Sequence, residues 1–243
     1  MANRLANVNV DCRDPAVVAH FWSALLDWPI AHEDPEETDV RSPTAPWTFD
    51  LVFAPVPEPK QGKNRVHLDL ASDSPVHQLE LVERAVALGA TPADVGQDGV
   101  PWVVLADPEG NEFCVLEPRA EYRGCGAIGA VVTDTPDPDA AAVFWAEAAG
   151  MDVGRTGQVA GLRPPPGLPW LEFLPTADLK RVKNRVHLDV APEPGGDPAA
   201  VVAGLVRRGA VVVDRDHPWT VLTDPQGSEF CVLNPSVTDT PGR

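Results

Sequence analysis

The order of apolar and polar side chains changes its period along the chain, and each period indicates a type of element. Residues 7–10 alternate between polar and apolar side chains, as in a half-buried strand. The apolar side chains of residues 16–26 follow helical spacing, and Asp14 and Pro15 before them form a helix-start signal. Similar signals predict these further elements: strands at 49–53, 65–70, 102–105 and 112–116, and a helix at 74–88.

The whole pattern occurs twice, because three sequence blocks return in the same order. They are KNRVHLD at 63–69 and 183–189, Phe-Trp at 21–22 and 144–145, and EFCVL at 112–116 and 229–233. The offsets are 120, 123 and 117 residues, so the chain holds two copies of one domain, and each copy has the order β-α-β-β-β twice. We expect copy one at 1–118, a linker at 119–126, copy two at 127–236 and a tail at 237–243.

Composition and charge limit the kinds of partner. Hydrophobic residues make up 44% of the 243 residues, which is enough for a buried core and excludes a disordered chain. The 36 acidic residues outnumber the 19 basic ones and give a formal net charge of −17, which opposes nucleic acid and anionic membrane as partners. Since no apolar run is long enough to cross a bilayer and no apolar signal core is present, we expect a cytoplasmic protein. The four widely spaced cysteines are expected to be reduced thiols.

The order of elements and one repeated turn carry a resemblance to a known superfamily. The turn is DPEGN at 107–111 and DPQGS at 224–228, each directly before the last strand of its copy. With this order of elements, the chain resembles the vicinal-oxygen-chelate superfamily, which includes glyoxalase I, bleomycin-resistance proteins and extradiol dioxygenases, and it is most similar to tandem glyoxalase-like domains. The resemblance implies an α+β fold of tandem domains, in each of which two paired βαβββ modules form a cupped open barrel around a ligand. One such fold carries enzymes and binding proteins alike.

The resemblance also implies three positions for the ligands of a divalent metal: the first strand, the first strand of the second module, and the last strand. In copy one these positions fall on Asn7, His67 and Cys114. In copy two they fall on Ala130, His187 and Cys231. Only the histidines keep the expected ligand type, so we predict no metal and no other cofactor. A divalent metal in a rotated site of His67, Asp69 and Glu112 stays open as an alternative.

Strand alternation places a set of polar side chains on one face of each copy, where they would line the cup. The candidate ligand-binding residues are Asn7, Asn9, His67, Asp69, Trp102, Glu112 and Cys114 in copy one, and His187, Asp189, Glu229 and Cys231 in copy two. These side chains either form a hydrogen-bonded, solvated lining or orient a small organic ligand. We expect the principal pocket in copy one, because Ala130 and Val132 replace Asn7 and Asn9 in copy two.

Individual side chains leave further alternatives. His67 is a candidate catalytic general base, since the pKa of an imidazole lies at about 6.5. Trp102 and Trp219 either stack on a flat ligand or belong to the core. The cations of the two KNR segments either steer an anionic group or pair with local acids, and we favour the pairs. Cys114 and Cys231 are expected to fill volume rather than to act as nucleophiles.

Two functions are compatible with these observations. The first is a sequestering or resistance-type protein that binds a small molecule, and the incomplete set of metal ligands favours it. An acidic cup would prefer a cationic ligand. The second is a lyase, isomerase or dioxygenase of the same superfamily, either metal-dependent or with His67 as a metal-free general base. We favour binding, while enzymatic activity and the oligomeric state stay open.

Overall fold

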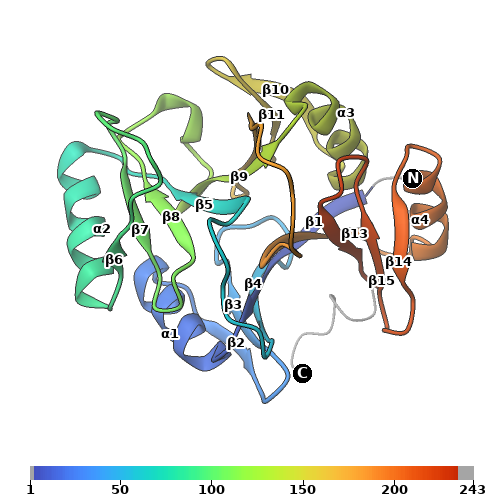
Figure 1. The fold of residues 1–243 in the computed structure, drawn as a ribbon, viewed down its shortest axis with the longest axis horizontal. Helices are drawn as coiled ribbons and strands as arrows, with labels where there is room; N and C mark the ends of the chain where they lie inside the picture. Colours follow the sequence, from blue (N-terminus) through green and yellow to red (C-terminus); the bar gives the residue numbers. More distant parts are fainter. Residues whose placement is uncertain (1–2, 235–243) are drawn as a thin grey trace.

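The computed structural model of the protein describes residues 3–234, so the tail expected at 237–243 lies outside the described residues. Within this range the chain forms two eight-stranded mixed sheets and four α-helices (Figure 1). The architecture is the α+β class that the resemblance implies. No helix in residues 3–234 is long and apolar enough to cross a membrane.

Each copy contributes eight strands and two α-helices, as the repeat predicts. Copy one forms β1 (Asn3–Cys12), α1 (Pro15–Leu26), β2 (Ile30–Glu33), β3 (Thr38–Arg41), β4 (Asp50–Pro55), β5 (Val66–Leu70), α2 (Pro75–Ala87), β6 (Thr91–Pro92), β7 (Val103–Ala106) and β8 (Glu112–Val115). Copy two forms β9 (Ile128–Thr135), α3 (Pro138–Ala149), β10 (Asp152–Thr156), β11 (Val159–Arg163), β12 (Trp170–Pro175), β13 (Val186–Pro192), α4 (Pro198–Val206), β14 (Val211–Asp214), β15 (Thr220–Thr223) and β16 (Glu229–Val232). A short 3-10 helix, η1 (Ala120–Tyr122), lies in the linker.

Each α-helix begins at a proline that follows a capping side chain. The Asp14 carboxylate accepts a hydrogen bond from the Val17 amide at 3.2 Å, which satisfies one of the amides that a helix leaves free at its start. The other helices are capped in the same way by Ser74, Asp137 and Asp197. Gly150 directly follows α3 and has a φ angle of 65°. A Cβ at this position would lie 1.9 Å from the Asn3 carbonyl oxygen. Glycine therefore lets α3 end directly against β1.

The strand order shows that each sheet joins two βαβββ modules, one from each copy. Sheet A has the order β14-β15-β16-β13-β1-β4-β3-β2, and sheet B has the order β10-β11-β12-β9-β5-β8-β7-β6. At the centre of sheet A, β1 is antiparallel to β13, and at the centre of sheet B, β5 is antiparallel to β9. Paired modules in cupped sheets are confirmed, whereas the expectation that one cup takes all its strands from one copy is wrong.

The two modules of one copy contact each other through the core instead of along a strand edge. Phe21 and Trp22 of α1 pack edge-on against Phe113 of β8, with ring centroids 6.0 and 5.0 Å apart. The Trp22 Nε1–H group also donates to Asp107 Oδ2 at 3.3 Å, in the turn before β8. The counterparts in copy two are Phe144, Trp145, Phe230 and Asp224.

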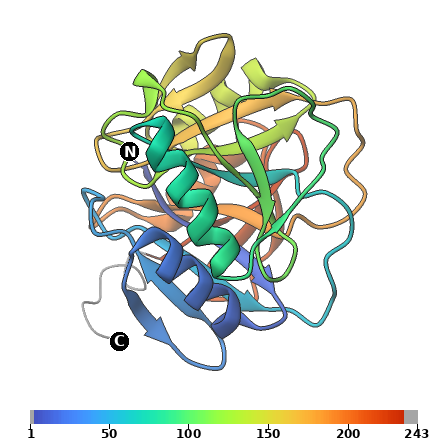
Figure 2. The same cartoon turned by 90° about the vertical axis from the view of Figure 1, so that its left-hand side faces the viewer.

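Helices α1 and α3 lie where the two sheets meet, because each of them contacts both sheets. Helix α1 contacts β3 and β4 of sheet A, α2 contacts β8 of sheet B, and the two helices also contact each other, side by side in Figure 2. Buried apolar residues of both sheets and all four helices form one continuous core. Because the modules of a copy meet through these helix-covered faces, the edges of β1 and β5 are free to pair with strands of the other copy.

We predict that copy one alone does not form a stable monomer. In a fragment of residues 1–126, β1 and β5 would lose their partners β13 and β9, and unpaired edges associate with other chains. We expect a dimer through β1 and β5 of two fragments, or aggregation, with an unfolding midpoint that rises with concentration. Light scattering and urea denaturation would measure this. A monomer that unfolds cooperatively at a concentration-independent midpoint would contradict it.

Candidate functional site

The polar side chains of β1 lie in sheet A, where β13 of copy two supplies their neighbours. Asn7 is paired with Asp189 and Asn9 with His187 in the antiparallel register, and Asp189 is also level with Cys231 of β16. Residues that are paired across neighbouring strands point to the same face of a sheet. These five side chains therefore share one face, which we call cup A.

Cup A also includes the carboxyl group of Asp39, which was not among the candidate residues predicted from the sequence. Val52 of β4 is paired with Asn9 on one side and with Asp39 of β3 on the other. Burial raises the pKa of Asp39 to about 7, and neighbouring carboxylates add to the shift. Asp39 is partly buried, and such a carboxyl group with a pKa near neutrality is a candidate functional group. Asp39 lies in a strand of only four residues, Thr38–Arg41, and no motif of the sequence marks it.

Four buried polar atoms of cup A have no hydrogen-bond partner among the described residues. They are Asn7 Oδ1, Asn9 Oδ1, Asp39 Oδ1 and His187 Nδ1. A buried polar group without a partner costs about 1–3 kcal/mol, and folded proteins keep few of them. Because β13, β1, β4 and β3 are consecutive in sheet A, these atoms lie on one continuous stretch of the cup. Because neighbouring protein atoms cover these atoms, a bound molecule could reach them only after side chains in the cup move.

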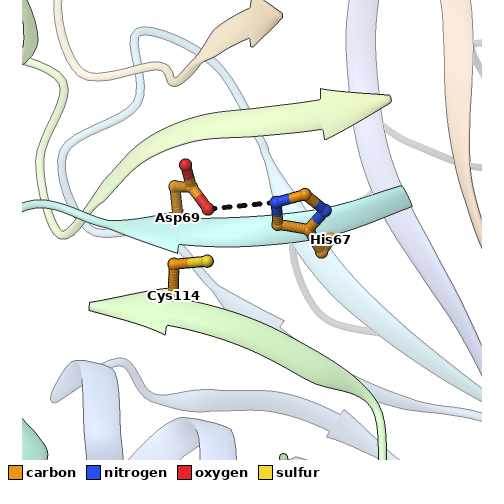
Figure 3. Close-up of side chains that lie close together, drawn as sticks. All are labelled: His67, Asp69 and Cys114. Carbon is orange, nitrogen blue, oxygen red and sulfur yellow. Dashed lines mark ion pairs between the residues drawn. The ribbon is translucent and has the colours of Figure 1, made fainter. Parts of the chain in front are cut away.

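The other histidine of the repeated segment lies in sheet B, on a face that we call cup B. Figure 3 shows His67 and Asp69 of β5 beside Cys114 of β8, with His67 Nε2 and Asp69 Oδ1 3.3 Å apart. The paired positions of β9 carry the apolar side chains Val132 and Ala130. Cup B is therefore less polar than cup A on this side.

The structure corrects the expected composition of the copy-one pocket. Asn7 and Asn9 do not share a cup with His67, because β1 pairs with β13 and β5 pairs with β9. Alternation along a strand determines which face a side chain takes, but it does not determine which strand lies next to it. The polar pair of β1 is combined with His187 and Asp189 instead, so the more polar cup is a hybrid of the two copies.

The linker fills part of cup B. Tyr122, at the end of η1, is only 4% exposed and packs into the apolar cluster that includes Cys114 and Ala130. Its hydroxyl group donates to Glu172 Oε1 of β12 at 2.9 Å. The guanidinium group of Arg119 lies over the Tyr122 ring, 5.8 Å from the centroid. A side chain of the protein itself therefore occupies cup B.

Two of the expected cup residues, Glu112 and Glu229, form ion pairs with lysines of the loops that precede β5 and β13. Glu112 Oε1 lies 2.8 Å from Lys60 Nζ, and Glu112 Oε2 accepts a hydrogen bond from the Asn64 amide at 3.1 Å. Glu229 makes the equivalent contacts in copy two. These carboxylates fasten the basic loops to the last strands. Among the described residues, the groups that could hold a metal do not include Glu112, so the rotated site is not assembled.

The basic segments before β5 and β13 pair with acids across the two copies, as favoured from the sequence. Lys63 Nζ lies 2.6 Å from Asp134 Oδ2, and Lys183 Nζ lies 2.5 Å from Asp11 Oδ2. A cavity of about 780 Å³ lies between these segments, and another of about 660 Å³ lies between the linker and α2. The linings of these two cavities do not include the cup histidines, and the nearby cations are largely neutralised, so the cups remain the stronger candidates.

Trp102 and Trp219 stand beside the cups, and their position is compatible with either expected role. Trp102 Nε1–H donates to Gln97 Oε1 at 2.9 Å, and the indole packs against the apolar cluster of cup B. Trp219 stacks on His217 with centroids 5.2 Å apart and packs against the apolar cluster of cup A. Both indoles are partly buried, so each could border a ligand while it also contributes to packing.

Each cup gathers three potential ligand atoms within 4.8 Å of one another, contributed by His187, Asp189 and Cys231 in cup A and by His67, Asp69 and Cys114 in cup B. Such N, O and S donors suit zinc in type. However, burial, reinforced by the neighbouring aspartate, raises the pKa of both thiols above the usual range, and only a thiolate binds a metal well. The remaining first-strand positions, Asn7 and Ala130, add no strong ligand. These residues do not fit the metal that the superfamily implies.

Comparison with known proteins agrees with the fold and the repeat. The glyoxalase-like domain family matches the chain twice, at residues 7–116 and 130–233. The two matches together cover most of the chain, so this protein belongs to the glyoxalase-like domain family. No curated protein gives a significant sequence match.

Two solved structures share the fold over nearly the whole chain. Glyoxalase I from Zea mays has a TM-score of 0.66 and 15% identity, over 97% of this chain and 93% of that one. A protein from Bacillus subtilis subsp. subtilis str. 168, named as a dioxygenase, has a TM-score of 0.62 and 13% identity, over 94% of this chain and 84% of that one. At such identities the likeness shows the fold alone, and the function has to be argued from the site.

We predict that the protein, purified without added metal, holds less than about half an equivalent of Fe, Zn, Ni or Mn per chain, because a site without a full ligand set binds weakly. Elemental analysis by mass spectrometry measures the content directly. One equivalent per chain that disappears in His187→Ala would contradict the prediction and place a metal in cup A. The same loss in His67→Ala would place it in cup B.

Proposed function

We propose that this protein binds a small organic molecule in cup A. The observation that carries the proposal is the set of buried polar atoms on Asn7, Asn9, Asp39 and His187 that have no hydrogen-bond partner within residues 3–234. A buried polar surface of this kind is unfavourable unless a ligand or ordered water satisfies it. Small-molecule sites commonly combine a few such polar groups with apolar walls, and Trp219 and Val221 contribute to an apolar wall here.

The chemistry of the unpartnered atoms defines what the ligand must offer. Asn7, Asn9 and Asp39 each present an oxygen that accepts hydrogen bonds. A complementary ligand therefore carries N–H or O–H groups, and the net charge of −17 favours a cationic or neutral ligand over an anion. The protein would act as a sequestering or resistance-type binding protein of the glyoxalase-like family.

A second candidate function, metal-free isomerisation or elimination, is favoured by one observation. The pKa of Asp39, raised to about 7 by burial, matches the requirement for a general base at neutral pH. Asp39 would take this role in place of His67, because Tyr122 occupies the cup that His67 faces. Incubation of candidate ligands with the protein and product analysis by NMR would separate the two functions, since a binding protein returns its ligand unchanged.

We predict that His187→Ala weakens ligand binding about 10- to 100-fold, equivalent to roughly 1–3 kcal/mol for the loss of a buried hydrogen-bonding group. His67→Ala, the matched substitution in cup B, should change the affinity less than about twofold. Ligands would be found by thermal-shift screening of small amines and hydroxylated compounds, and affinities measured by calorimetry. If His67→Ala abolished binding while His187→Ala did not, the site would have to be assigned to cup B.

We also predict a pH dependence of stability that Asp39→Asn removes. Burial raises the pKa of Asp39 from 3.8 to about 7, so the folded state holds its proton more tightly than the unfolded state. The resulting stabilisation is complete below about pH 4 and is lost as the pH rises toward 7. Relative to Asp39→Asn, the wild type should therefore lose on the order of a few kcal/mol of unfolding free energy across this window. Urea denaturation at a series of pH values tests this, and parallel profiles for the two proteins would refute it.

A further inference from the structure

The cavity of about 660 Å³ between the linker and α2 has an apolar floor. Four leucines of the buried core line it: Leu25 and Leu26 of α1, Leu70 of β5 and Leu81 of α2. Helices α1 and α2 lie side by side here (Figure 2). The volume lies in the range of small-molecule sites, which commonly combine apolar walls with a few polar groups. The polar groups of the lining therefore indicate what the cavity would bind.

The charged side chains of this lining are mostly cationic, although the whole chain carries a net charge of −17. Arg84 of α2 and Arg119 and Arg123 of the linker line the cavity, and Asp73 is the only acidic residue of the lining within residues 3–234. The Asp73 side chain is 97% exposed, so water and salt screen its charge. An anion in the cavity therefore meets more positive than negative charge.

Two of the three arginines have no acidic partner within residues 3–234. Arg84 Nη1 donates to the Leu25 carbonyl oxygen at 3.4 Å, which is a long hydrogen bond to a neutral group, and the Arg123 side chain makes no hydrogen bond or ion pair in this range. Arg119, in contrast, lies 2.7 Å from Glu117. Arg84 and Arg123 are both exposed, so their N–H donors are accessible to a ligand, unlike the covered atoms of cup A.

His77 of α2 adds a hydrogen-bond donor to the lining. Its Nδ1 accepts a hydrogen bond from the Asp73 amide at 3.1 Å, so the proton of the neutral ring lies on Nε2. The His77 side chain is 39% exposed. His77 and Arg84 stand at positions i and i+7 of one helix, which places them on the same face of α2. Both can therefore contact one ligand from the same side.

The backbone of the linker is fixed at the cavity by close contacts with both copies. The Gly167 amide of copy two donates to the Gly124 carbonyl oxygen at 2.7 Å. Gly126 has a φ angle of 84°, and a Cβ there would lie 2.8 Å from Thr44 Oγ1 of copy one. These four residues all line the cavity. A ligand bound there contacts both copies and the linker, so it should stabilise the folded chain.

We propose that this cavity, which we call the linker site, binds an organic monocarboxylate with an apolar body. The carboxylate pairs with Arg84 and Arg123, because guanidinium groups bind carboxylates through charge-assisted hydrogen bonds, and His77 Nε2–H donates a further bond. The apolar body covers the leucine floor. A dianion such as phosphate fits less well, since the floor would remove water from its second charge without replacing it. The lining includes no residue of cup A, so the linker site is independent of the proposed function.

The first experiment measures binding of 4-phenylbutanoate to the full chain by calorimetry. We expect one site per chain. Acetate, which has the charge without the apolar body, should show no saturable binding, and 4-phenylbutan-1-ol, which has the body without the charge, should bind about tenfold more weakly or less. Equal affinities for the acid and the alcohol would overturn the proposal, because the arginines would then contribute nothing. Absence of binding by 4-phenylbutanoate would overturn it as well.

The second experiment removes the two cations. Arg84→Gln and Arg123→Gln should each weaken 4-phenylbutanoate binding about fivefold or more, and the ligand should raise the thermal unfolding temperature of the wild type but not of the double variant. The control is Arg207→Gln, which makes the same change at an exposed arginine directly after α4 and outside the lining. It should change the affinity less than about twofold. A double variant that binds as tightly as the wild type would refute the site.

A third comparison tests the location with both arginines intact. Ala120 lines the cavity and is exposed, so Ala120→Trp should fill part of the space and weaken binding about tenfold or more without unfolding the chain. His187→Ala, which alters cup A, should leave the affinity for 4-phenylbutanoate unchanged. If His187→Ala abolished binding while Ala120→Trp and the double arginine variant did not, the carboxylate would lie in cup A and the linker site would be refuted.

Discussion

The contact between a helix and the turn of its partner module determines the rest of this structure. Trp22 packs on Phe113 and donates to the buried carboxylate of Asp107, and Trp145 repeats both contacts with Phe230 and Asp224. These contacts bury the helix-covered faces of the two modules of each copy against each other. The central strand edges are then the surfaces that still need partners, and an unpaired edge is unfavourable. Pairing across the copies satisfies both edges and creates two cups of mixed origin.

The mixed origin gives the two cups different chemistry from nearly the same sequence blocks. KNRVHLD supplies a histidine and an aspartate to each cup, but the strand next to it is β1 in cup A and β9 in cup B. Asn7 and Asn9 therefore add polar groups to cup A, and Ala130 and Val132 leave cup B apolar enough to accept the ring of Tyr122. The linker fills part of cup B, where two buried polar atoms, on His67 and Asp69, lack hydrogen-bond partners in residues 3–234, and cup A keeps four such atoms.

Local signals in the sequence predict the elements well but not the neighbours of each strand. Asp14 with Pro15 predicts the start of α1, and the alternation of residues 65–70 predicts the face that His67 takes, since both depend on short-range geometry. Strand pairing depends on which apolar faces meet in the core. The alternation of side chains is compatible both with pairing of β1 and β5 within copy one and with pairing of these strands with β13 and β9 of copy two. Asp39 lies in a four-residue strand without a motif, and Glu112 matched the cup pattern although Lys60 already neutralises it.

The unit on which function depends is thus the pair of modules in one sheet and not the sequence copy. Cup A takes Asp39 from the first half of copy one and His187 from the second half of copy two, so substitutions in both copies act on one site. Within a copy, changes in the first half and in the second half affect different cups, except where they disturb the aromatic contacts between the modules. A tandem repeat arranged in this way can keep one cup as an internally filled structural element. The other cup is then free to change its polar residues, since the wall, the turns and the core that hold both cups remain the same.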